Sequence, residues 1–128
     1  MNKGKRFEDL YIYKEAQGLV GEIYKITKNK EFARDYNLVN QIRRAAISVV
    51  ANIAEGYERG TNTEFTQFLY ISKASCGEIR AEIEIARNQG YISEVKHKEI
   101  YEYCCRIGGM ISSFIKSMKE SGYKGAKR

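Results

Sequence analysis

The chain has 128 residues, of which 43% are hydrophobic and 30% charged, the balance of a single globular domain rather than of a disordered protein. The sequence contains no proline, which favours long helices, and no run of about 18 apolar residues, which excludes a membrane-spanning helix. The net charge of +6 fits either an anionic partner or ordinary solubility charge, and the odd count of three cysteines with no secretory signal indicates a reducing cytoplasm.

Apolar residues recur at helical spacing and predict four helices. The first is expected over about residues 8–27. Gly18 and Gly21 lie inside it and indicate a close approach of another helix. The charged stretch 28–36 is expected to be a connector.

The second helix is expected over about residues 37–55, with Gly56 as its end. A loop that carries Arg59 follows. The third helix is expected to begin near Thr61, whose spacing from Glu64 is that of a capping box.

The third helix is expected to close at Gly90, and Ser93 is expected to cap the fourth. Inward residues of the fourth helix alternate in spacings of three and four, as in helix bundles. They are His97, Ile100, Cys104, Ile107, Ile111, Phe114 and Met118. Helices joined by short loops pack antiparallel. We therefore expect an all-α, up-down-up-down four-helix bundle as one domain over 1–128, ordered over about 7–120 with flexible basic termini.

The second helix has an apolar arc about twice as wide as an ordinary bundle helix needs. Two interpretations are open: this helix is the most buried one of a monomer, or its extra arc packs against another subunit. In the second interpretation the interface candidates are Ile47, Ala51 and Ala54.

The same helix carries a narrow polar sector. Arg44, Ser48, Asn52 and Glu55 are expected to form a structural polar network, unless the sector simply faces solvent. Glu55 also precedes Arg59 by four residues, the favourable order for an ion pair on a helix.

The segment 41–56 reads QIRRAAISVVANIAEG and is followed by Tyr57, Glu58 and Arg59. Together with Phe7-Glu8-Asp9-Leu10, Glu64-Phe65, Phe68-Leu69-Tyr70-Ile71-Ser72, Gly77-Glu78 and Gly90-Tyr91-Ile92, it resembles the family of 23S rRNA intervening-sequence proteins. The resemblance runs from about Phe7 to Met118 and is most specific around Asn52 to Gly56. It implies a bacterial four-helix bundle that assembles as a ring, usually a pentamer, with no agreed catalytic residues. A distantly similar protein binds nucleic acid.

The sequence contains no recognisable set of catalytic or metal-ligating residues. The single histidine, His97, has no suitable partners in Cys104 and Cys105, which lie about two turns further along the helix and point to different faces. No phosphate-binding loop or Ser–His–Asp set occurs. We expect no enzyme activity, no cofactor, no metal and no small-molecule substrate.

Two functional hypotheses remain. In the first, a homo-oligomer binds RNA or DNA electrostatically through phosphate contacts. The basic candidates are Lys3, Lys5, Arg6, Arg43, Arg59, Lys124, Lys127 and Arg128. In the second, the protein is a structural or protein-interaction scaffold without a nucleic acid partner.

Overall fold

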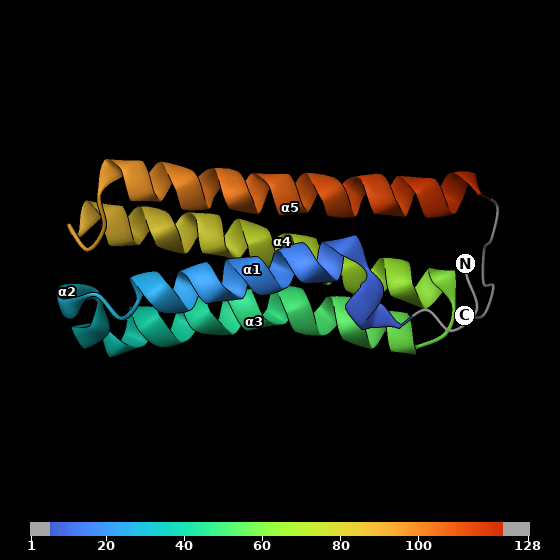
Figure 1. The fold of residues 1–128 in the computed structure, drawn as a ribbon, viewed down its shortest axis with the longest axis horizontal. Helices are drawn as coiled ribbons and strands as arrows, with labels where there is room; N and C mark the ends of the chain where they lie inside the picture. The colour runs from blue at the N-terminus through green and yellow to red at the C-terminus, as the bar shows by residue number, and fades with distance from the viewer. Residues whose placement is uncertain (1–5, 122–128) are drawn as a thin grey trace.

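The fold is built from four long helices that lie along one another (Figure 1). A computed structural model describes residues 6–121. The long helices are α1 (Tyr11–Ile26), α3 (Tyr36–Glu58), α4 (Asn62–Asn88) and α5 (Glu94–Glu120). A 3-10 turn, η1 (Phe7–Asp9), precedes them, and a short helix, α2 (Lys30–Arg34), joins α1 to α3. The all-α four-helix bundle is thereby confirmed, with no strand among the described residues.

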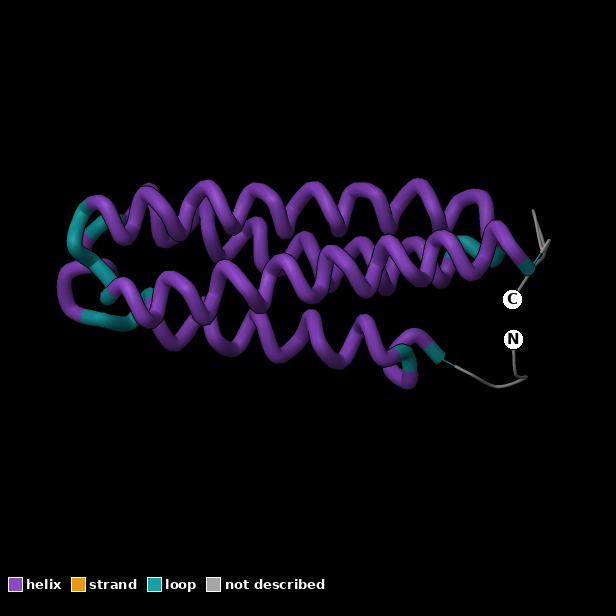
Figure 2. Tube along the Cα trace, turned by 90° about the horizontal axis from the view of Figure 1, so that it is seen from above, coloured by secondary structure: helices purple, strands orange, loops and turns teal. Residues whose placement is uncertain are grey.

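The long helices alternate in direction along the chain. By the colours of Figure 1, α1 and α4 run toward the end where α2 lies, and α3 and α5 run away from it. Each long helix packs against the next in sequence, and α1 also packs against α5, so the four helices enclose a common interior. Figure 2 shows the same bundle from above, with its loops at the two ends.

One continuous apolar core fills the interior of the bundle. Its isoleucines recur at helical spacing on every long helix, which is the pattern that the sequence shows. The largest fully buried side chains are Phe32, Phe65, Leu19, Ile23, Ile42, Ile53, Leu69, Ile79, Ile83, Ile100, Ile107 and Ile111.

Two predicted helix starts are confirmed. Thr61 Oγ1 accepts a hydrogen bond from the backbone N–H of Glu64 at 3.2 Å, and Ser93 Oγ accepts one from that of Lys96 at 3.0 Å. Each cap satisfies an N–H that has no partner within its helix, which fixes where α4 and α5 begin.

Gly56 does not end a helix, contrary to the sequence prediction. The helix continues through it to Glu58, and the glycine with a positive φ of 93° is Gly60. A Cβ at Gly56 would lie 2.6 Å from Phe68 Cβ on α4, so glycine is required here for close packing of α3 on α4. The predicted connector 28–36 also differs, because it contains α2, whose Phe32 is buried.

The expected close approach at α1 occurs at one of its two glycines. The Tyr103 hydroxyl of α5 occupies the space where a Cβ of Gly18 would lie, whereas nothing lies near Gly21. That hydroxyl donates to the Glu15 carbonyl oxygen at 3.1 Å, which ties the last helix to the first.

Candidate functional site

The basic residues proposed to contact phosphate fall into two groups. Outside the described residues lie Lys3, Lys5, Lys124, Lys127 and Arg128. Within them lie Arg6, which is exposed at the start of η1, and Arg43 and Arg59 of α3 and its C-terminus. The structure does not bring these three together as one cluster, since Arg43 and Arg59 are 16 residues apart, about 24 Å along the axis of α3.

Arg43 is half-buried and bonded to the neighbouring helix. Its Nε donates to Thr27 Oγ1 at 2.9 Å, and its guanidinium carbon lies 4.3 Å from the centre of the Tyr24 ring. Thr27 is itself buried and donates to the Ile23 carbonyl oxygen at 2.7 Å. Arg43 therefore connects α3 to the end of α1, and only part of its charge faces solvent.

Arg59 is flanked by carboxylates. Its Nη2 lies 3.3 Å from Glu55 Oε2, as the spacing predicts, and its Nη1 lies 3.9 Å from Glu64 Oε2. The guanidinium also stacks over the Phe68 ring at 4.9 Å. These neighbours offset its charge, which weakens it as a phosphate contact.

The polar residues of α3 contact one another only in the middle of the helix. Asn52 Nδ2 donates to Ser48 Oγ at 3.0 Å and to the Ser48 carbonyl oxygen at 2.8 Å, and Ser75 Oγ of α4 donates to Ser48 Oγ at 2.9 Å. Arg44 is exposed, and Glu55 pairs with Arg59. The short side chains at 48 and 75 let α3 and α4 approach closely.

The apolar candidates of α3 point partly to solvent. Ile47 is 47% exposed, Ala51 is exposed and Ala54 is half-buried. On the neighbouring helix α4, Tyr70 and Ile71 are 49% and 48% exposed. Apolar surface on two adjacent helices is a feature of surfaces that pack against a partner.

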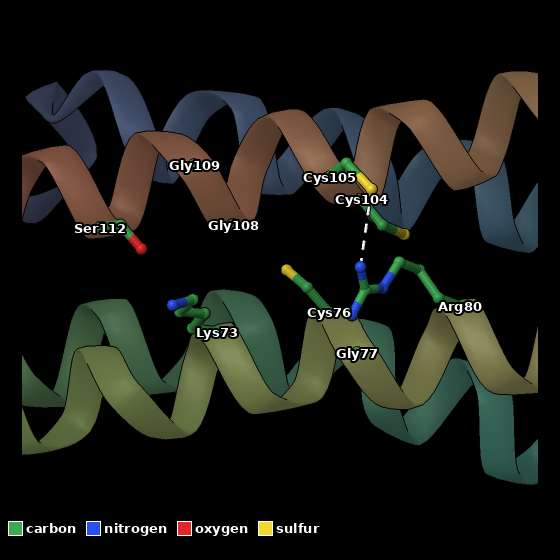
Figure 3. A pocket seen from close by; sticks show the side chains of 9 residues that line it. All are labelled: Lys73, Cys76, Gly77, Arg80, Cys104, Cys105, Gly108, Gly109 and Ser112. Carbon is green, nitrogen blue, oxygen red and sulfur yellow. Dashed lines mark hydrogen bonds between the residues drawn. The ribbon is translucent and has the colours of Figure 1, made fainter.

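A groove of about 210 Å³ opens between α4 and α5 (Figure 3). Lys73, Cys76 and Arg80 project into it from α4, and Cys105 and Ser112 from α5. The remaining lining residues are Gly77, Cys104, Gly108 and Gly109. The wall contains two cations and no carboxylate.

The three thiols of this groove differ in exposure. Burial raises the pKa of Cys76 to about 11 and that of Cys104 to about 12, so both remain thiols at neutral pH and pack as apolar groups. Cys105 is exposed, and Arg80 Nη1 donates to its Sγ at 3.6 Å.

Sequence reasoning missed this groove as a site. Lys73, Gly77 and Arg80 repeat at spacings of four and three, which places them on one face of α4, and this signal was available. Their position opposite Gly108 and Gly109 depends on the register of α4 against α5, which the sequence pattern does not give.

Glu82 of α4 is a buried carboxyl, 7% exposed, with no hydrogen-bond partner at Oε1. Burial, and then the nearby Glu78 carboxylate, raise the pKa of Glu82 to about 7. A group protonated in this range donates a hydrogen bond rather than carrying a buried charge.

Within residues 6–121, no group of three or more His, Cys, Asp or Glu side chains is placed to hold a metal ion. His97 is buried and packs 5.7 Å from the Tyr101 ring. No helix in this part of the chain has the length and apolar character needed to span a bilayer.

Comparisons with known proteins identify one family. The sequence model of the family described as 23S rRNA-intervening sequence protein matches residues 8–113. A similar solved structure is that of a protein of unknown function from the S23 ribosomal protein family of Bacteroides thetaiotaomicron, with a TM-score of 0.75 and 22% identity, covering 82% of this chain and 98% of that one. No curated protein matches the sequence.

Proposed function

Because the chain belongs to the 23S rRNA-intervening sequence protein family, whose name assigns no activity, we propose that it is a non-enzymatic homo-oligomeric bundle that binds nucleic acid through phosphate contacts. The observation that carries the proposal is the charge balance. The chain has 22 Lys and Arg residues against 16 Asp and Glu, a net charge of +6. Such an excess attracts a polyanion without base-specific contacts.

Assembly would multiply this charge. A ring presents each basic residue once per subunit, so weak contacts add by avidity. The exposed Ile47 and Ala51 of α3 support assembly, because covering their apolar surface with a second copy would stabilise the oligomer. The pentameric count comes from the family resemblance alone.

The assembly proposal is tested by Ala51→Glu, which places a carboxylate in the proposed interface at a cost of several kcal/mol if the site is dry. The matched control is Ser113→Glu, at an exposed small residue of α5. Light scattering should show a wild-type oligomer, a smaller Ala51→Glu species and an unchanged Ser113→Glu oligomer. A wild-type monomer at micromolar concentration would contradict the proposal.

The nucleic acid proposal is tested by salt titration of the intact wild-type oligomer with single-stranded RNA and duplex DNA. Affinity should fall steeply with salt, by a log–log slope of about 0.7 per neutralised phosphate on single strands and about 0.9 on duplex DNA. The effect should be alike for unrelated sequences, because phosphate contacts carry no base information.

The scaffold hypothesis is the second candidate. It is favoured by the engagement of Arg43 with Thr27, which leaves Arg43 half-buried, and by the ion pair of Arg59 with Glu55, which offsets the charge of Arg59. If the intact oligomer binds neither RNA nor DNA at about 50 mM salt, where phosphate contacts are strong, the scaffold hypothesis replaces the first. The double variant Arg43→Glu with Arg59→Glu is interpretable only if it keeps the wild-type oligomer.

A further inference from the structure

The α4–α5 groove combines positive charge with open space. Figure 3 shows Lys73 and Arg80 of α4 on either side of Cys76, with Ser112 of α5 at the Lys73 end of the groove. The two cations are seven residues apart, about 10.5 Å along the helix axis, and share one face of α4. Their side chains are long enough to contact one small anion placed between them.

Neither cation is neutralised within the described part of the chain. No carboxylate lies within 4.0 Å of Lys73 or Arg80, whereas Arg59 and Arg106 each pair with a glutamate. Arg80 instead contacts the Cys105 sulfur at 3.6 Å, a weak acceptor that leaves its remaining N–H groups available. The groove is therefore a site of uncompensated positive charge.

Glycines keep the groove open. A Cβ at Gly77 would lie 3.6 Å from Arg80 Nη2, and one at Gly108 would lie 4.0 Å from Lys73 Cγ. At Gly109 a Cβ would meet nothing within 4 Å, so any larger side chain there would extend into open space. Three side-chain-free positions thus adjoin the two cations.

We infer that the α4–α5 groove binds a phosphate group between Lys73 and Arg80. Guanidinium and ammonium groups are the usual protein partners of phosphate. The group comes either from a small phosphate compound or from a nucleic acid strand. In the second case the inference rests on the proposed function and gives it a phosphate contact in α4.

Cys105 provides a built-in reporter of occupancy. It is exposed at the groove, whereas Cys76 and Cys104 are buried, so a neutral alkylating reagent such as iodoacetamide reacts first at Cys105. Cys105→Ser should abolish this fast reaction, which assigns the signal to Cys105. Occupancy is then measured as the ratio of alkylation rates without and with ligand.

The first probe is pyrophosphate on the full chain. At ten times its Kd the free groove falls to about one-eleventh, so alkylation of Cys105 should slow by about tenfold. Protection should be lost in Lys73→Gln with Arg80→Gln. It should be kept in Lys14→Gln with Lys25→Gln, a control that removes the same charge from exposed positions of α1.

A second variant keeps both cations in place. Gly109→Glu adds a carboxylate where a Cβ meets no neighbour within 4 Å, so the fold is preserved. Protection should be lost here too, because the carboxylate repels the anion. Protection that persists in both groove variants would overturn the inference, as would a wild-type protein that neither pyrophosphate nor an oligonucleotide protects.

The second probe is a single-stranded oligonucleotide, which separates the two proposals. If pyrophosphate protects Cys105 but an oligonucleotide binds without protecting it, the groove takes a small phosphate compound and the proposed function stands on contacts elsewhere. Pyrophosphate protection without oligonucleotide binding supports the groove and contradicts the proposed function. If the oligonucleotide protects Cys105, the Lys73→Gln with Arg80→Gln variant should also lower the log–log salt slope by about 0.7, for the one phosphate on a single strand that the groove binds.

Discussion

Replacing Glu82 by glutamine should stabilise the protein, and by an amount that depends on pH. The side chain is 7% exposed, and burial together with the Glu78 carboxylate raises the pKa of Glu82 from 4.5 to about 7. Glutamine keeps the shape and can still donate to Glu78, but it never ionises. The substitution therefore removes only the cost of a buried negative charge.

The sign and size follow from the two pKa values of Glu82. Because the folded pKa lies above the unfolded one, the folded protein binds the extra proton, and stability falls as pH rises from 4.5 through about 7. A shift of one pKa unit corresponds to about 1.4 kcal/mol. The free energy of unfolding of Glu82→Gln should therefore exceed that of the wild type by about 1 kcal/mol at pH 5 and about 3 kcal/mol at pH 8.

The assay is urea unfolding followed by circular dichroism at both pH values and one protein concentration. Glu102→Gln, on an exposed part of α5, is the matched control and should change little at either pH. The reasoning would be refuted if the difference in free energy of unfolding between Glu82→Gln and the wild type were equal at pH 5 and pH 8, or absent at pH 8.

Further unfolding measurements test the packing of α3 on α4. Gly56→Ala should cost about 1–3 kcal/mol, because its Cβ would lie 2.6 Å from Phe68 Cβ. Gly21→Ala, where a Cβ meets nothing, should instead gain up to about 1 kcal/mol from helix propensity; equal effects at the two glycines would contradict the packing argument. Ser72→Ala should cost about 1 kcal/mol by removing the buried 2.6 Å bond from Ser72 Oγ to the Val49 carbonyl oxygen, and a neutral result would mean that water replaces the bond.

Local signals in the sequence predicted the helices well. Isoleucine spacing marks the inward faces, and the caps at Thr61 and Ser93 lie within a few residues of the helix starts they control. The end of α3 was misplaced, because a glycine can end a helix or admit a neighbour. The choice at Gly56 depends on Phe68, which belongs to the next helix.

The surroundings of the candidate surface residues could not be predicted from the sequence, for the same physical reason. Arg43 was expected to be available to phosphate, but its partner Thr27 comes from α1. Arg80 and Cys105 meet only because α4 and α5 pack in one particular register. Contacts between helices decide which charges are available, and periodicity within one helix carries no information about them.

The hydrogen bonds between helices also differ in how far along the chain they reach, which bears on the order of folding. The bond from Ser72 to Val49 spans 23 residues, whereas that from Tyr103 to Glu15 spans 88. Short loops cost less entropy to close, so we expect the α3–α4 hairpin to form early and the α1–α5 contact to form last. The bundle would then open first between α1 and α5. Amide hydrogen exchange should therefore be faster in these two helices than in the other long helices.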